Sequence, residues 1–443
     1  MASTYLQRTP SSTGNRDKWT WSAWVKRSKL GANLTLFSAW ADSSNNSVIT
    51  FLDDDALRYY DKAAGSVQAN LYTNRKFRDT NSWYHIVVVY DSGNNTSGDR
   101  VKIYVNGVEE TSFSTDTMPG QNNDSTVNKA SCPHYIGTDD TTGYFFDGAM
   151  SHIHFIDGTA YDASAFGETD TTTGEWKAKT SPSVTYGTNG FLILKDGNTI
   201  TDQSSNSNDF TLGGGTLTDL KDNPDNVFAT INSLVKFQYP STYSNGNNTV
   251  TPHASGSGSS PFSTLAVSSG KYYAELKIVT TDAGHAVGII DLDKYAPDVQ
   301  ADEWFYRHSY GYGYQQNGQK FNNNSGSAYG NSFTDGDILG IALDLDNNKL
   351  YFSKNGTWQN SGDPTSGSTG TGSAFDIANG TYAFTAYGYY SDIRQWNFGN
   401  GYFGTTAITT NSGNGYSGAE GSSKFNYTVP TGYSALSTKG LNL

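Results

Sequence analysis

Short runs of aromatic and β-branched residues, separated by Gly, Asn, Asp and Ser, follow one another along almost the whole chain. Large aromatic and small residues alternate in Trp19–Val25, and Ser82–Asp91 is a nearly continuous apolar run. Such runs are typical of strands, and alternation indicates one buried face. Aromatic residues make up 14% of the 443 residues, whereas charged residues make up only 16%. The sequence therefore predicts an all-β fold, which disfavours helical bundles, coiled coils and Rossmann-type enzymes.

The charge, the cysteine content and the apolar segments of the chain restrict the partners and the cellular compartment that we expect for it. The net charge is −13, and no run of Lys or Arg could form the basic stripe that a phosphate backbone requires, so we expect no nucleic-acid partner. Cys132 is the only cysteine, which excludes an intramolecular disulfide. Met1–Ser12 lacks the apolar segment of a signal peptide, and no stretch approaches the roughly 20 apolar residues of a membrane span. We expect a chain that is made in a cytoplasm and has no membrane partner.

Strand patterns divide the chain into two modules. The first module spans residues 1–166, where Arg100–Val108 alternates and carries the Asn106–Gly107 pair that favours a hairpin turn. The second module spans residues 261–400, where the strands Asp337–Asp344 and Lys349–Gly356 repeat this layout and end in another Asn-Gly pair. The pattern predicts two β-sandwiches, each with its own aromatic core.

Two segments fall outside these modules. Residues 167–260 form a connecting β/loop segment that ends in the Ser/Gly-rich stretch Ala254–Ser260, a composition typical of a flexible linker or exposed loop. Residues 401–443 form a C-terminal tail.

The landmarks of each module resemble a known family. With Trp83–Ile86 and Tyr104–Gly107, the first module resembles the concanavalin A-like/laminin G-like jelly roll. With Gly270–Tyr273, Gly336–Gly340 and Leu350–Gly356, the second is similar to a SPRY domain. The resemblance implies two jelly-roll β-sandwich modules that serve binding or structure and have no fixed reaction.

A second resemblance concerns the whole chain. Phe155–Thr159, Ala165–Glu168 and Tyr427–Leu436 are similar to segments of virion structural proteins from marine tailed bacteriophages. This resemblance implies a virion localisation, as a tail fibre, appendage or capsid-associated component.

Aromatic residues in loop-like contexts are the candidate contact sites. In the family that the second module resembles, ligands bind through loops at one end of the sandwich. The candidates are Trp304, Tyr306, Tyr389 and Tyr390, which could stack on sugar rings or contact a protein. Tyr310, Tyr312 and Tyr314 alternate with Gly on one strand face, a pattern that favours packing in the core.

Calcium is the one metal that the sequence suggests. Oxygen-rich loops suit this hard cation, and laminin G-like folds can carry it at a rim. The candidates Asp53, Asp54, Asp55, Asp139 and Asp140 lie near turns, although acidic turns are common in this chain and follow no calcium-loop spacing.

Histidines are weaker candidates for metal ligands. His152 and His154 would share one strand face, and their alternation with apolar residues favours a solvent-facing position. His85 lies within an apolar run and is predicted to be a buried core residue.

The sequence gives little support for enzymatic catalysis. Glycoside hydrolysis needs two carboxyl groups about 5–9 Å apart, and the acidic string Glu168–Glu175 has the wrong spacing for the Glu-x-Asp-x-Glu strand of laminarinase-type enzymes. No Gly-x-Ser-x-Gly elbow is present either. We therefore predict no enzymatic activity and no catalytic residues.

The interpretation that follows is a non-enzymatic virion surface component of a tailed phage, serving in host attachment by binding host glycans or neighbouring virion subunits. Alternatives are a bacterial extracellular carbohydrate-binding protein and a glycan-active hydrolase. The aromatic content and virion symmetry favour a homo-oligomer.

The C-terminal tail is a candidate docking segment within that interpretation. Its candidate anchors are Tyr427, Val429, Pro430, Tyr433 and Leu436, and the alternative is that it packs back on its own module. Truncation before Phe425 is expected to leave both sandwiches folded but to prevent incorporation of the chain into particles.

Overall fold

The computed structural model describes residues 3–195, 197, 199–254, 258–281, 284–295, 304–409 and 414–443. These residues form two compact units, residues 1–219 with 223–225 and residues 220–222 with 226–443. Residues 255–257 of the predicted linker lie outside the described part of the chain. Across the described ranges, no helix is long and apolar enough to cross a membrane.

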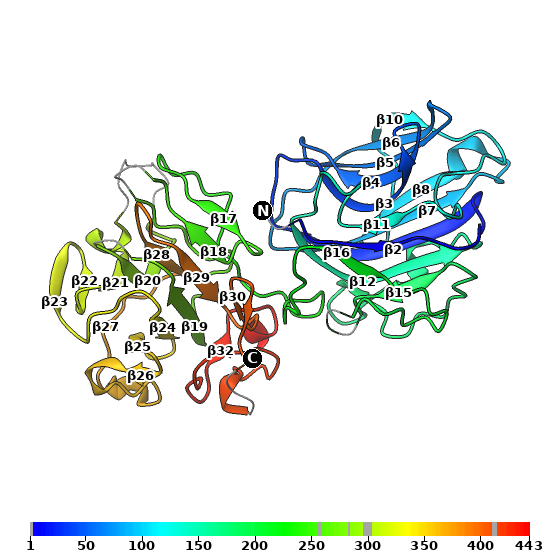
Figure 1. Ribbon diagram of the computed structural model, residues 1–443. Coiled ribbons are helices and arrows are strands. Elements are labelled where there is room, and N and C mark those ends of the chain that lie inside the picture. The colour runs from blue at the N-terminus through cyan, green and yellow to red at the C-terminus, as the bar shows by residue number, and fades with distance from the viewer. Residues whose placement is uncertain are drawn as a thin grey trace. The chain divides into compact units, whose positions relative to one another are not determined.

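The first unit is a sandwich of two antiparallel sheets (Figure 1). The strands of its eight-stranded sheet, in spatial order, are β10 (Phe113–Thr117), β6 (Ser66–Lys76), β5 (Ala56–Ala63), β4 (Asn45–Phe51), β3 (Leu34–Asp42), β11 (His134–Ile136), β1 (Tyr5–Arg8) and β16 (Thr211–Gly214). The strands of its six-stranded sheet are β15 (Phe191–Ile193), β12 (Gly148–Asp157), β2 (Lys18–Arg27), β7 (Trp83–Asp91), β8 (Val101–Val105) and β9 (Val108–Glu110).

Alternating side chains fill the space between these two sheets. Trp19 and Trp21 of β2 are completely buried, and Trp19 stacks on Tyr90 of β7 with a ring-centroid distance of 5.4 Å. Tyr59 of β5 meets the same indole from the opposite sheet at 5.7 Å. The alternation in the sequence thus corresponds to one aromatic core.

A strap of residues 159–186 covers the outer face of the six-stranded sheet. It contains the hairpin β13 (Gly167–Thr169) and β14 (Trp176–Ala178). Phe166 and Trp176 of the strap pack with Val87 and Val89, the outward-facing residues of β7. The first part of the predicted connecting segment therefore belongs to the first unit.

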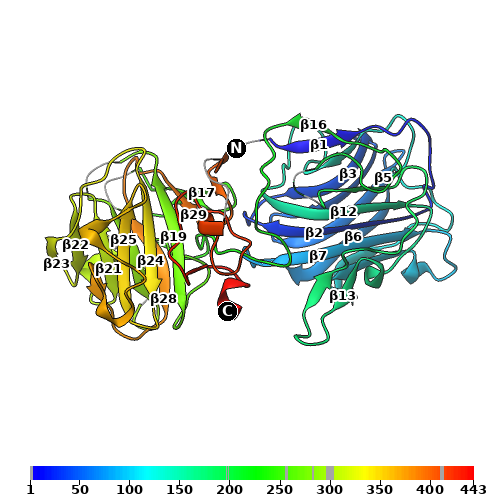
Figure 2. The same cartoon turned by 90° about the horizontal axis from the view of Figure 1, so that it is seen from below.

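The second unit is also a sandwich (Figure 2). Its larger sheet contains β17 (Thr242–Ser244), β18 (Thr249–Thr251), β29 (Arg394–Asn397), β19 (Lys271–Ile278), β24 (Ile338–Asp344), β25 (Lys349–Lys354) and β26 (Thr357–Trp358), with β27 (Phe375–Asp376) on β25 and β32 (Ser434–Ala435) parallel to β19. The facing sheet contains β23 (Ser325–Ala328), β22 (Gln319–Asn322), β21 (Gly311–Gln315), β20 (Ala286–Asp291) and β28 (Tyr382–Tyr387). A small hairpin joins β30 (Tyr402–Phe403) to β31 (Thr406–Ala407).

Helical structure in the described ranges is confined to short 3₁₀ turns. These are η1 (Ser97–Asp99), η2 (Ala163–Ala165), η3 (Phe305–Arg307), η4 (Gln359–Ser361), η5 (Gly367–Thr369), η6 (Asn414–Tyr416) and η7 (Gly440–Asn442). The prediction of an all-β chain with two β-sandwiches is confirmed.

Both predicted Asn-Gly turns are tight hairpin turns. Asn106 and Gly107 join β8 to β9 with φ values of 49° and 82°. Asn355 and Gly356 join β25 to β26 with φ values of 49° and 79°. Two consecutive positive φ angles are what a two-residue hairpin turn of the favoured twist requires, and Asn and Gly accept them most readily.

Candidate functional site

An aromatic cluster forms at the edge of the five-stranded sheet in the second unit. Trp304, which precedes η3, stacks on Tyr387 at the end of β28 with a centroid distance of 4.4 Å. Tyr389 lies 6.4 Å from the indole, and Tyr390 lies 4.8 Å from Tyr389. The guanidinium carbon of Arg307 lies 3.8 Å from the centroid of the indole ring. We call these five residues the aromatic cluster.

The structure brings all four predicted contact residues together, since Tyr306 lies 5.6 Å from Trp304 by ring centroids, but only three of them reach the surface. Tyr306 is only 1% exposed and, like Tyr387, lies in the core beneath the surface residues Trp304, Tyr389 and Tyr390, so it cannot itself contact a ligand. Sequence reasoning missed Tyr387 and Arg307. Tyr387 ends an apolar alternating strand and therefore resembled a core residue, while Arg307 follows Trp304 by three positions and could have been found as a cation beside an indole.

A buried polar group supports the turn that presents Tyr389 and Tyr390. A carboxylate oxygen of Asp392 accepts a hydrogen bond from the backbone N–H of Tyr389 at 2.9 Å and lies 2.7 Å from Nδ1 of His285. Arg394 is buried and donates to the carbonyl oxygen of Ala386 at 2.8 Å. The turn is thus held by Asp392 of the loop itself, by His285, which directly precedes β20, and by Arg394 of β29.

Tyr390 combines exposure with an unusual backbone conformation. Its φ is 53°, in the left-handed region that a bulky residue rarely adopts, and 44% of the residue is exposed. Strained positions of this kind tend to gather at functional sites. With the exposed ring of Tyr390, the half-buried rings of Trp304 and Tyr389 and the exposed guanidinium of Arg307, the aromatic cluster is suited to stacking on a sugar ring or contacting a protein surface.

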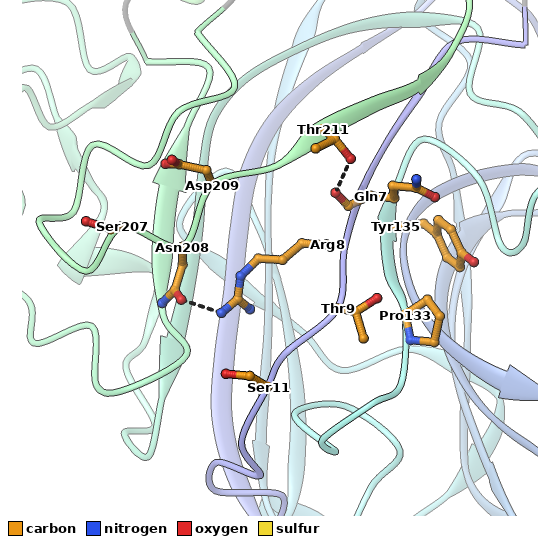
Figure 3. A pocket seen from close by; sticks show the side chains of 10 residues that line it. All are labelled: Gln7, Arg8, Thr9, Ser11, Pro133, Tyr135, Ser207, Asn208, Asp209 and Thr211. Carbon is orange, nitrogen blue, oxygen red and sulfur yellow. Dashed lines mark hydrogen bonds between the residues drawn. The ribbon is translucent and has the colours of Figure 1, made fainter.

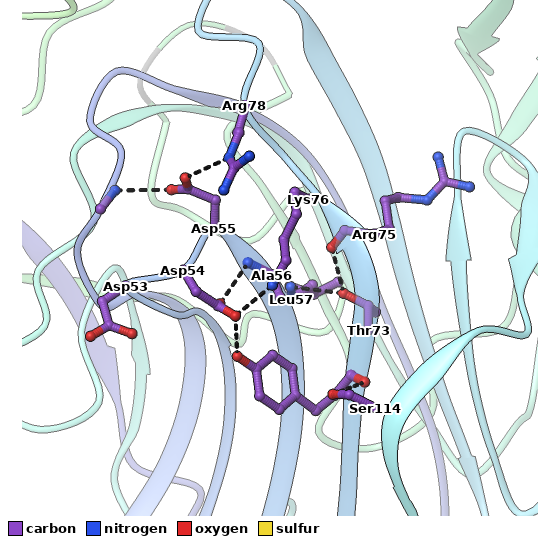
Figure 4. A network of polar contacts seen from close by, with 12 residues as sticks. Asp53, Asp54, Asp55, Ala56, Leu57, Thr73, Arg75, Lys76, Arg78 and Ser114 are labelled. Atoms are coloured by element: carbon purple, nitrogen blue, oxygen red, sulfur yellow. Dashed lines mark hydrogen bonds and ion pairs between the residues drawn. The ribbon is translucent and has the colours of Figure 1, made fainter.

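The Asp53–Asp55 turn binds basic side chains of its own unit (Figure 4). Asp54 accepts hydrogen bonds from Lys76 and Tyr72, which lower the pKa of its carboxyl to about 2 against the opposing effect of burial. Asp55 accepts from Arg27 and Arg78, each at 3.1 Å. The Asp53 carboxylate points away from these contacts.

The Asp139–Asp140 turn uses its carboxylates to hold the backbone. Asp139 accepts the N–H of Asp140 at 2.8 Å, and burial raises the pKa of Asp139 to about 6. Asp140 accepts the N–H of Thr142 at 2.6 Å. Among the residues that the structure describes, no three His, Cys, Asp or Glu side chains gather as metal ligands would. The calcium hypothesis therefore gains no support from the geometry.

Two histidine predictions have different outcomes. His85 is buried as predicted, between the indoles of Trp24 and Trp176, and burial lowers the pKa of its imidazole to about 3. His154 does not face solvent, because the strap covers it: its Nδ1 lies 2.9 Å from the hydroxyl of Tyr186, and it is 2% exposed. The prediction of a solvent-facing His154 is wrong.

The C-terminal tail packs on its own unit. Val429, Tyr433 and Leu436 are buried against the second sandwich, whereas Tyr427 and Pro430 are half-buried. This arrangement corresponds to the alternative that the sequence left open. Buried anchors in the same unit are not available to dock a separate partner in this conformation.

Comparison with known proteins assigns each unit to a fold family. Residues 2–164 match the concanavalin A-like lectin/glucanases superfamily (Laminin_G_3), and residues 271–389 match the SPRY domain. The chain therefore carries a concanavalin A-like module followed by a SPRY domain, both β-sandwiches.

Individual relatives match only in part. Ran-binding protein 9 of Danio rerio is 34% identical over 88 residues, which are 20% of this chain and 14% of that protein. Ran-binding protein 9 of Homo sapiens is 35% identical over 88 residues, or 20% of this chain and 12% of that protein. The matched region thus spans about a seventh or less of their length.

Solved structures are similar over less than half of this chain. The SPRY domain of human HERC1 is 20% identical with a TM-score of 0.28, over 35% of this chain and 91% of that chain. A heptameric SAP-like pentraxin from Limulus polyphemus is 16% identical with a TM-score of 0.28, over 44% of this chain and 89% of that chain.

Proposed function

We propose that the chain is a non-enzymatic binding protein on the surface of a tailed-phage virion, and that the aromatic cluster of its SPRY domain contacts the ligand. The observation that carries the proposal is the exposed, strained Tyr390 beside the stacked Trp304–Tyr387 pair. Rigid aromatic side chains contribute large contact area at low cost in conformational entropy, which suits a recognition surface.

The ligand would be a host-surface glycan or a neighbouring virion subunit. Sugar rings present C–H faces that stack on indole and phenol rings, and Arg307 adds donors for hydroxyl groups. The relatives that match 88 residues of this chain are named as Ran-binding proteins, and a binding role is the part of that name that we carry over.

The virion assignment rests on the similarity of Phe155–Thr159, Ala165–Glu168 and Tyr427–Leu436 to phage structural proteins. Synthesis in the host cytoplasm and repetition with the symmetry of the particle follow from that assignment. The test is a density map of purified particles together with their protein composition by mass spectrometry. We expect the chain at an exposed, symmetric position, and its absence from the particles would contradict the assignment.

The absence of enzymatic activity is tested separately. The full chain is incubated with laminarin, agar, alginate and host surface polysaccharide, and released reducing ends are measured. We expect no release above that of a heat-denatured sample. Release that disappears when one acidic residue is replaced would contradict this part of the proposal.

A further inference from the structure

An open cleft with a volume of about 480 Å³ lies in the first unit, where three segments distant in the sequence meet. They are the end of β1 with the residues that follow it, Pro133 and Tyr135 at β11, and the loop that leads into β16. Figure 3 shows the Arg8 side chain in the middle of the cleft, between Asn208 and Thr9. A volume of this size falls within the range of small-molecule sites.

Arg8 is the only cation among the described residues that line this cleft. In the described part of the chain, its guanidinium makes one hydrogen bond, to the side-chain oxygen of Asn208. Burial lowers the pKa of Arg8 although Asp202 opposes this, so the surroundings do not fully compensate the charge. A guanidinium has five N–H donors, which leaves several for a ligand.

Asn208 is held rigidly beside this guanidinium. Its amide nitrogen donates to the carbonyl oxygens of Thr188 at 2.9 Å and Gly190 at 2.8 Å, which directs its oxygen at Arg8. Its backbone N–H donates to Asp202 at 2.9 Å. The floor of the cleft is therefore preorganised, and a ligand would not have to order it.

The rim adds hydroxyl groups and one carboxylate. Thr9, Ser11 and Ser207 are exposed and line the cleft. Asp209 accepts the backbone N–H of Asp202 at 2.8 Å with one oxygen, and its other oxygen can accept from a ligand. The cleft thus offers donors for an anion in the middle and acceptors for hydroxyl groups at the rim.

We propose that this cleft binds a sugar acid, with the carboxylate of a uronic acid on Arg8 and its ring hydroxyls on Asp209 and the rim hydroxyl groups. A guanidinium pairs with a carboxylate through two parallel hydrogen bonds, which fixes the orientation of the ligand. A neutral sugar would bring no negative charge to Arg8 beyond that of Asp202, and a carboxylate without a sugar ring would leave the hydroxyl groups of the rim without a partner on the ligand. The proposal is independent of the aromatic cluster, because every lining residue belongs to the first unit.

The test is a titration of the full chain with digalacturonic acid, followed by ligand-observed NMR. Galactose serves as the neutral analogue and succinate as the carboxylate without a sugar ring. We expect both to bind at least tenfold more weakly than digalacturonic acid. If galactose bound as tightly as digalacturonic acid, the proposed role of the carboxylate would be contradicted. If succinate bound as tightly, the proposed role of the sugar ring would be contradicted. Failure of digalacturonic acid to bind would overturn the proposal.

Substitutions of residues that line the cleft test whether digalacturonic acid binds there. Arg8→Gln should weaken binding of digalacturonic acid at least tenfold, whereas Arg8→Lys, which keeps the charge but loses the planar fork, should weaken it less. Arg78→Gln is the matched control, since this exposed arginine pairs with Asp55 outside the cleft, and it should bind like the wild type. Thr9→Phe fills the cleft from an exposed position and decides the matter if Arg8→Gln does not fold. Unchanged binding by Thr9→Phe or by folded Arg8→Gln would overturn the proposal.

Discussion

Glu275 of β19 is a completely buried carboxyl group that holds the C-terminal tail. It accepts the backbone N–H groups of Asn426 and Tyr427, both at 2.8 Å, and further hydrogen bonds from Asn397 and Tyr273, both at 3.2 Å. Burial raises the pKa of Glu275 to about 7, although these four donors favour the charged form. The effect of removing the Glu275 carboxylate from water on its pKa therefore outweighs the opposite effect of the hydrogen bonds.

This raised pKa predicts a pH dependence of stability. The folded state keeps the Glu275 proton up to about pH 7, whereas an unfolded chain releases it near the ordinary value of 4.5. The resulting stabilisation is present in full below the ordinary pKa and is lost as the pH rises through about 7, with a size on the order of 3 kcal/mol. The stability advantage of wild type over Glu275→Gln should thus shrink between pH 5 and pH 8.

Urea unfolding at a series of pH values measures this difference. Glu420→Gln is the matched control, because Glu420 also binds tail backbone, at Ala435 and Ser423, but is only half-buried. Its difference from wild type should change less with pH. An advantage of wild type over Glu275→Gln that grows with pH would contradict the assignment.

At the scale of elements, the C-terminal tail is a structural layer of the SPRY domain. Phe425 is completely buried, and its ring meets Tyr273 edge-on at 5.0 Å. Together with Val429 and Tyr433 it forms a cluster on the outer face of the larger sheet. Truncation before Phe425 would expose this face and remove two of the four donors to Glu275, Asn426 and Tyr427, so it should destabilise the second unit.

Phe425→Ala should lower the free energy of unfolding of the second unit by about 3–5 kcal/mol, because it leaves a cavity in a packed cluster. Differential scanning calorimetry should show a lower Tm for that unit alone. Leu441→Ala, an exposed position in the same tail, should change stability by less than about 0.5 kcal/mol. A Phe425→Ala variant as stable as Leu441→Ala would show that the tail is not part of the core.

The elements that sequence reasoning predicted are those whose pattern is local. The Asn-Gly hairpins and the alternating strands can each be recognised from a stretch of about ten residues. His154 could not be placed in this way, because the register of β12 shifts between Ser151 and His154, and because Tyr186 of the strap, which contacts it, follows 32 residues later in the sequence. The tail has no alternating pattern, since it packs through single buried residues between polar turns.

The candidate site was predictable only in part for a similar reason. Trp304, Tyr389 and Tyr390 stand out as aromatic residues in loops. Their convergence with Tyr387 depends on where β28 ends relative to η3, which is a tertiary property. No sequence pattern predicts the cleft at Arg8. Its three segments are distant in the sequence and meet only because β11, β1 and β16 pair at one end of the eight-stranded sheet.

At the scale of the whole molecule, the two units have separate cores, and their boundary lies earlier than the linker composition suggests. Phe228, Ala229, Ile231 and Val250 precede the Ser/Gly-rich stretch, yet they are buried in the second unit. Each unit should therefore fold alone only if the chain is divided near residue 225.

This division predicts a clear contrast between fragments. Residues 1–225 and 226–443 should each give a β-type circular dichroism spectrum and a cooperative unfolding transition. A fragment of residues 261–443 should lack that transition, because the four buried residues are missing from its core. A stable 261–443 fragment would show that residues 226–260 do not belong to the core of the SPRY domain.

The central claim is that this chain binds its ligand through the aromatic cluster. The most direct measurement is binding of the full chain to an array of bacterial surface polysaccharides and purified virion proteins. Wild type is compared with Trp304→Ala and Tyr390→Ala, and with Tyr144→Ala as an exposed aromatic control in the first unit. Both cluster variants should lose at least tenfold in affinity for the ligand that wild type binds, and the control should lose none. Undiminished binding by folded Trp304→Ala and Tyr390→Ala would contradict the claim.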